Sequence, residues 1–203
     1  MSDREKFWFF IRNLLRGLLA LLVVVGGFVL LKDQIDPDYL QWLAPVYEQP
    51  FLVYVVYSAS ELLFGIIPPE IFMIWSLRLE KLASYVLNVA GLALISYLAG
   101  VSGYLIGNYL NHTRFYAYFR RKVFGHYERH LQNFGAFLIV VAALTPLPFS
   151  GVSMLIGSVD FPAKKYLIYA TTRFARFAAY SYVVWQANTL WTIKKVRQAT
   201  KIY

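Results

Sequence analysis

Two carboxylates stand inside a strongly apolar stretch, residues 51–75, and they are the side chains best suited to chemistry. Glu61 and Glu70 are separated by a short segment that contains Pro68 and Pro69. A carboxylate at bilayer depth costs about 2.5 to 3.5 kcal/mol on insertion scales, so such groups usually face a protein interior or a water-filled cavity. A buried acid that can exchange a proton is suited to coupling transport to an ion gradient. We therefore predict proton-coupling roles for Glu61 and Glu70.

Two arginines near the other end of the chain are the matching cations. Arg173 and Arg176 lie three residues apart, on one face of a predicted helix, several residues inside an apolar run. Arginine stays charged at depth. The pair is predicted to face the carboxylates Glu61 and Glu70, because four unpaired ionic groups in one small membrane domain would be hard to accommodate. The alternative is that both side chains only reach toward interfacial headgroups.

Prolines and glycines interrupt two apolar stretches that lie about half a chain apart. The predicted breaks are Gly65, Pro68 and Pro69 in the first stretch and Pro146, Pro148 and Gly151 in the second. Because proline removes an amide and disfavours helix before it, the first helix should break around Ile66 and Ile67. Broken backbone at membrane depth must be buried or line a cavity. Matching breaks in two halves favour an inverted repeat with two opposed re-entrant helical hairpins; two kinked spanning helices are the alternative.

Composition sets the class of protein. The chain has 203 residues, of which 59% are hydrophobic, and its apolar runs reach the roughly 20 residues that a membrane span needs. We expect an all-α integral membrane protein. The net charge of +9 comes largely from basic residues between or beside apolar segments, where they set topology, so no nucleic-acid partner is expected. The absence of cysteine excludes disulfides and thiolate metal sites.

One domain with four segments is predicted. Residues 1–50 hold an N-terminal membrane helix and an acidic loop on the outer face. Residues 51–110 hold the first hairpin and a spanning helix at 82–110, in which small residues at 99, 103 and 107 predict close helix contact. Residues 111–133 form a basic cytoplasmic segment. Residues 134–203 hold the second hairpin, a final helix at 166–191 and a basic tail, whose side of the membrane stays open.

The sequence gives little support for a metal site or for an enzyme active site. His126 and His130 lie four residues apart, but no third ligand is nearby, so no metal site is expected. We find no nucleophile beside a histidine base and no phosphate-binding loop, and we therefore expect no enzyme and no bound cofactor.

The motifs that follow one another along the chain resemble those of a known family. They are Glu61, Phe64 and Gly65, then Pro68, Pro69 and Glu70, then Gly100, Gly103 and Gly107, and finally Thr145, Pro146, Gly157 and Phe161. In this order and spacing they resemble the DedA family of bacterial inner-membrane proteins, whose domain is also called VTT or SNARE-associated. The resemblance covers roughly residues 51–185.

The resemblance implies a flippase or scramblase in the bacterial inner (cytoplasmic) membrane, multi-pass, with a cytoplasmic N-terminus. Its partner would be a lipid with a phosphate headgroup, undecaprenyl phosphate or a phospholipid, moved with a proton or sodium gradient. The family acids fall on Glu61 and Glu70. The family arginines flank the proline of the second hairpin, where this chain has Ala143 and Phe149. Arg173 and Arg176 are therefore expected to replace them and to bind the lipid phosphate, because arginine binds phosphate oxygens through two parallel hydrogen bonds.

Two other functions stay open at this point. A proton- or cation-coupled exporter of small solutes would need only the two acids. A non-transporting membrane scaffold would need none of the four ionic groups. Whether the chain forms a homo-oligomer is likewise open.

Overall fold

The computed structural model describes residues 48–79, 81–111 and 128–200, together with isolated helical positions between 4 and 27. Its elements are α3 (Pro50–Leu62), α4 (Pro69–Ser76), the 3-10 helix η2 (Leu77–Leu79), α5 (Leu82–Asn111), α7 (Glu128–Leu144), α8 (Phe149–Gly157), α9 (Ala163–Ala170) and α10 (Thr172–Thr200). No strand occurs in these ranges, which confirms the all-α prediction. The acidic loop at 32–47 and the segment 112–127, with His126, lie outside the described residues.

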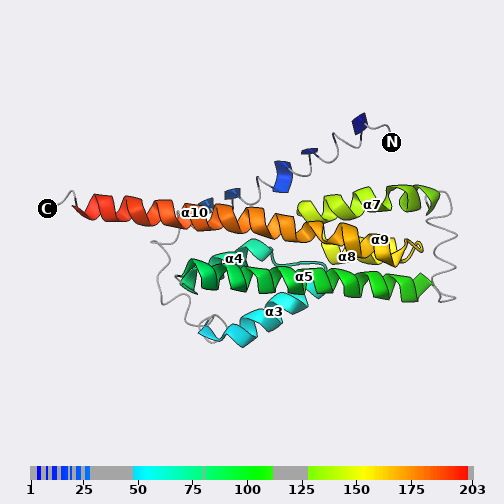
Figure 1. The fold of residues 1–203 in the computed structure, drawn as a ribbon, viewed down its shortest axis with the longest axis horizontal. Coiled ribbons are helices and arrows are strands. Elements are labelled where there is room, and N and C mark those ends of the chain that lie inside the picture. The colour runs from blue at the N-terminus through cyan, green and yellow to red at the C-terminus, as the bar shows by residue number, and fades with distance from the viewer. Residues whose placement is uncertain are drawn as a thin grey trace.

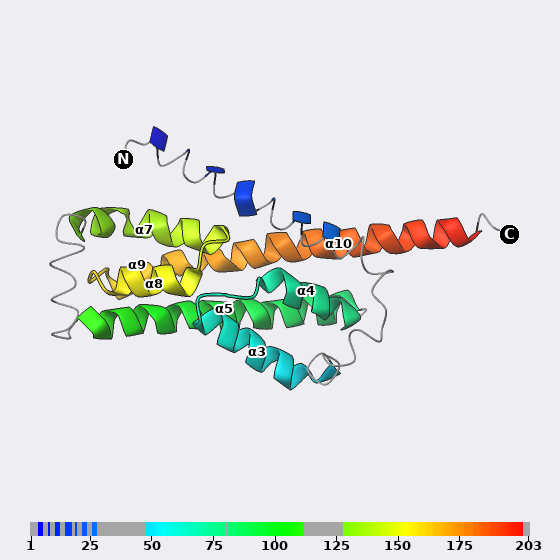
Figure 2. The same cartoon turned by 180° about the vertical axis from the view of Figure 1, so that it is seen from behind.

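The two long helices, α5 and α10, run along the length of the molecule (Figure 1). The α3–α4 pair enters from one end and turns back, and the α7–α8 pair does the same from the other end (Figure 2). The two turns meet near mid-length, because a Cβ on Gly151 of α8 would lie 2.9 Å from the ring of Phe64. We call α3–α4 the first hairpin and α7–α8 the second hairpin.

The first hairpin turns in a non-helical segment, residues 63–68, that includes the predicted break. Helix α3 ends at Leu62, and Phe64 and Gly65 follow with φ of 69° and 68°. The amide of Gly65 donates to the carbonyl of Ser60 at 2.7 Å, the bond that closes a Schellman-type helix end. The prediction of a break around Ile66 and Ile67 is confirmed, but the left-handed turn, and not the prolines, ends α3.

The prolines instead start the returning helices. Pro69 is the first residue of α4, where its missing amide costs no hydrogen bond, and Pro148 is the N-cap of α8. Gly151 lies inside α8, so its predicted place in the second break was wrong. The absence of a side chain there leaves room for Phe64.

Small residues bring α5 and α8 into backbone contact, which confirms the predicted close helix contact. A Cβ on Gly103 would lie 2.5 Å from the carbonyl oxygen of Ser150, and one on Gly107 would overlap the carbonyl of Met154. On the facing helix, a Cβ on Gly157 would overlap the carbonyl of Tyr104. The second hairpin is therefore fixed to α5 without intervening side chains.

The long helices match the sequence prediction in part. Helix α5 covers the predicted span at 82–110, and it is the helix among the described residues that is long and apolar enough to cross a membrane. The single helix predicted at 166–191 begins earlier, in α9, and is interrupted at Thr171. The hydroxyls of Thr171 and Thr172 donate to the carbonyls of residues 168 and 169 at 2.6 and 2.7 Å, which competes with the helical bonds.

Candidate functional site

Glu61 lies in the last turn of α3, where the first hairpin meets α5 and α10. Its side chain is paired with Arg173 of α10, whose Nη2 lies 3.4 Å from both carboxylate oxygens. Ser96 of α5 joins the two groups more closely. Its hydroxyl donates to Glu61 Oε2 at 2.7 Å and accepts from Arg173 Nε at 2.9 Å. The three side chains thus form a closed ring from three different helices.

A second ion pair lies beside the first. Glu70, in the first turn of α4, accepts from Arg176 Nη2 at 2.8 Å. The other terminal nitrogen of Arg176 donates to the carbonyl oxygen of Thr145 at 2.6 Å. Thr145 directly follows α7, and the break leaves its carbonyl without the amide that a continuing helix would supply. Arg176 therefore holds the two hairpins together through one acid and one backbone carbonyl.

All four ionic side chains are removed from solvent. The exposed fractions are 1% for Glu61, 5% for Glu70, 3% for Arg173 and 5% for Arg176. The predicted pairing of arginines with carboxylates is confirmed, and the alternative in which the arginines reach outward to the surface is wrong. A buried pair stabilises little compared with apolar groups of similar size, so the stability of the fold alone does not account for two such pairs.

Aromatic rings cover the flat faces of both guanidinium groups. The centre of the Arg173 guanidinium lies 4.9 Å from the ring of Phe149 and 5.6 Å from that of Phe177. The Arg176 guanidinium lies 4.9 Å from the ring of Tyr180. The rings attract the cation while offering no hydrogen-bond acceptor in the plane of its N–H groups.

Each of the two arginines has a nitrogen without a hydrogen-bond acceptor. Within the described part of the chain, Arg173 Nη1 and Arg176 Nε are buried and have no hydrogen-bond partner. The hydroxyl of Tyr180 is likewise buried and has no hydrogen-bond partner. An unsatisfied buried donor costs about 1 to 3 kcal/mol. The hydrogen-bonding capacity of the two guanidinium groups is therefore not filled by the protein.

A cavity of about 250 Å³ lies between the two turns and is lined by both acids and both arginines. The structure brings together here the predicted site residues from both ends of the sequence. Besides the ionic groups, those that line the cavity are Gly65, Pro68, Pro69, Pro146 and Pro148. Gly151 does not line it. The chemistry available in this cavity is proton exchange at the carboxylates and binding of an oxyanion by guanidinium groups.

Ser96 is the residue of this site that sequence reasoning missed. Several serines and threonines occur in the apolar helices, and most bond to a carbonyl of their own helix. Ser102 does so with Leu98, at 2.9 Å. Nothing in the local sequence separates Ser96 from Ser102, because the difference lies in which helices pack against each face of α5.

Metal ligands do not gather in the part of the structure that is described: no group of three His, Asp or Glu side chains occurs there. The histidine pair predicted not to bind metal includes His126, which lies outside the described residues.

Comparisons with family models, with curated proteins and with solved structures give no match to this chain. The resemblance to the DedA family therefore stays a prediction that rests on the motifs alone.

Proposed function

We propose that this chain is an integral membrane protein built as an inverted repeat, with the first and second hairpins re-entering from opposite faces. The length and apolar character of α5 support this proposal. Large apolar side chains on its outer surface, such as Leu87, which is 78% exposed, would then contact lipid. Ser96 is the fifteenth residue of the 30-residue helix α5, so the ionic cavity would lie near the bilayer midplane, where transporters commonly bind substrates.

We propose further that the protein moves a phosphate-bearing lipid, such as undecaprenyl phosphate or a phospholipid, with coupling to an ion gradient. One observation carries this proposal: two buried arginines, each held by an acid, line the same cavity. Guanidinium groups form strong paired hydrogen bonds with phosphate oxygens.

The acids supply the switch in this proposal. While Glu61 and Glu70 are ionised, they neutralise Arg173 and Arg176, and a phosphate must compete with them. Protonation of either acid removes its charge and frees its arginine for phosphate. Loss of the proton restores the ion pair and expels the phosphate, so binding and release follow proton movement across the membrane.

Lipid translocation in proteoliposomes that contain only this protein tests the proposal. We expect the wild-type protein to move fluorescent phosphatidic acid between leaflets. Arg173→Lys should reduce the rate at least tenfold, because a lysine lacks the planar guanidinium that can bond to Glu61, Ser96 and a phosphate at the same time. Arg78→Lys, at an exposed position, is the matched control and should keep the wild-type rate. Absence of translocation by the wild type, or an unchanged rate in Arg173→Lys, would reject the lipid-phosphate role and leave the small-solute exporter and the scaffold.

A further inference from the structure

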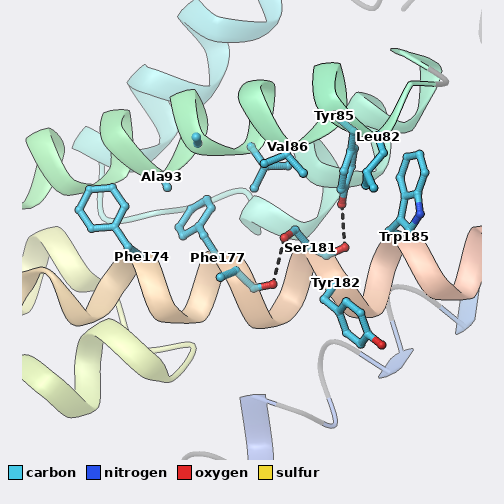
Figure 3. Close-up of a pocket in the computed structure, with 12 residues that line it drawn as sticks. Leu82, Tyr85, Val86, Ala93, Phe174, Phe177, Ser181, Tyr182 and Trp185 are labelled. Atoms are coloured by element: carbon cyan, nitrogen blue, oxygen red, sulfur yellow. Dashed lines mark hydrogen bonds between the residues drawn. The ribbon is translucent and has the colours of Figure 1, made fainter.

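An apolar groove of about 380 Å³ lies between α5 and α10, on a different side of α10 from the arginines. Figure 3 shows the side chains that line it, with Leu82 and Trp185 at one end and Ala93 and Phe174 at the other. Phe177 also lines the groove. Its ring is the one that lies 5.6 Å from the guanidinium of Arg173, so Phe177 lies between the groove and Arg173.

Two of the polar groups in this groove are already bonded to protein. The hydroxyl of Tyr85 donates to the carbonyl of Ser181 at 3.0 Å, and the hydroxyl of Ser181 donates to the carbonyl of Ala178 at 3.0 Å (Figure 3). The rest of the lining is mainly aliphatic and aromatic. An occupant of this groove therefore gains contact with carbon atoms and is offered few hydrogen bonds.

The dimensions favour a single hydrocarbon chain. Along α5, the groove extends from Leu82 to Ala93, which is roughly 16 Å at the helical rise of 1.5 Å per residue. The hydrocarbon of one leaflet is about 15 Å deep, half of the roughly 30 Å core. One turn of an α-helix with its side chains fills roughly 500 Å³, which exceeds the volume of the groove. The groove is narrow, apolar and about as long as one leaflet is deep, which matches the shape of one extended lipid chain.

We propose that this groove binds one hydrocarbon chain of a lipid whose phosphate is held by Arg173 and Arg176. The inference rests on the proposed function, in which the cavity holds the phosphate, and assigns a site to the hydrocarbon chain of the same lipid. The phosphate lies at mid-length, the chain passes over Phe177, and its far end reaches Leu82 and Trp185. Specificity then comes from the combination, because an oxyanion alone or a chain alone fills only one of two adjoining sites.

A photoactivatable phosphatidic acid with a diazirine at the end of one acyl chain tests this, in phosphatidylcholine vesicles that contain the full chain. After illumination, mass spectrometry should find the label on the peptides around Leu82 and Trp185. Ala178→Phe, which fills the groove, should reduce that labelling at least tenfold. Ala179→Phe adds the same bulk at a neighbouring exposed position outside the groove and should leave labelling unchanged.

Diacylglycerol with the same labelled chain is the probe without phosphate. Equal labelling by diacylglycerol and by phosphatidic acid would overturn the proposal, since the groove would then only contact bulk lipid. Equal loss of labelling in Ala178→Phe and Ala179→Phe, or label confined to the Ala93 end, would also overturn it. Failure of the proposed function looks different: phosphatidic acid labels the groove selectively, yet no lipid is translocated. If translocation depends on Arg173 but the groove is not labelled, the proposed role of the groove would be rejected and the proposed function would stand.

Discussion

The two hairpins have the same layout and different chemistry. Each consists of a helix, a break at mid-length and a shorter returning helix. The first hairpin brings both acids, Glu61 and Glu70, to the cavity. The second hairpin brings none, and contributes the carbonyl of Thr145, the ring of Phe149 and the hydroxyl of Ser150, which donates to the backbone carbonyl of Glu61 at 2.6 Å. Titratable groups thus come from one hairpin and fixed polar contacts from the other.

The two hairpins also differ in how closely they pack against α5. The second hairpin touches α5 backbone to backbone at Gly103 and Gly107. Where α5 faces the first hairpin, a Cβ on Gly91 would meet only the hydroxyl of Tyr54, at 3.9 Å. We infer from this comparison that the second hairpin is the rigid support and that the first, held partly by ion pairs, is the one that responds to protonation.

The largest effect is expected from breaking the bond that joins the hairpins. Arg176→Ala leaves Glu70 buried without its cation and removes the donor to Thr145, so we expect a loss of about 3 to 5 kcal/mol in stability, measured by denaturation of the purified protein. Adding Glu70→Gln should recover part of the loss, with a coupling of about 0.5 to 3 kcal/mol. Strictly additive effects would show that Arg176 and Glu70 do not stabilise each other in the folded protein.

Rigid support by the second hairpin is tested at the α5–α8 contact. Gly107→Ala places a methyl group on the carbonyl of Met154, and we expect a loss of about 3 kcal/mol, at the upper end of the cost of overpacking. Gly91→Ala is the matched control on the same helix and should be neutral or raise stability by up to about 1 kcal/mol. Melting temperatures of the two variants measure the contrast. Similar values would mean that the two hairpins are held equally tightly.

Ser96 sharpens the role of the first hairpin. Ser96→Ala removes the hydroxyl that bonds to both Glu61 and Arg173, and leaves Arg173 Nε without that acceptor, at an expected cost of about 1 to 3 kcal/mol. Ser102→Ala, on the same helix, removes only a bond to its own turn and should change stability by less than about 0.5 kcal/mol. Denaturation of both variants in the same detergent gives the comparison, and equal stabilities would exclude a bridging role for Ser96.

The smallest effect is expected at the turn of the first hairpin. Gly65→Ala introduces a Cβ at φ of 68° with open space around it, so the cost is conformational, about 1 kcal/mol. Pro68→Ala should cost less, because α3 already ends before it. If Pro68→Ala proves more harmful than Gly65→Ala in thermal denaturation, the prolines rather than the left-handed turn define the hairpin.

Sequence reasoning predicted the charges better than the turns. The pairing of Glu61 and Glu70 with arginines could be foreseen, because buried charges of opposite sign in one small domain need each other. The end of α3 could not, because Phe64 takes a left-handed conformation that the sequence pattern does not favour for a phenylalanine. The role of Ser96 depends on three helices meeting, which no local pattern encodes.

The most direct test of the central claim is a count of protons taken up when an oxyanion binds. Calorimetric titration of the purified protein with a short dialkyl phosphate, whose own charge does not change near neutral pH, is repeated in buffers of different ionisation enthalpy. If phosphate replaces a carboxylate at Arg173 or Arg176, binding takes up protons, and the uptake falls in the Glu61→Gln, Glu70→Gln double variant. Binding without proton uptake, or the same uptake in that variant, would contradict the claim that the acids are the switch.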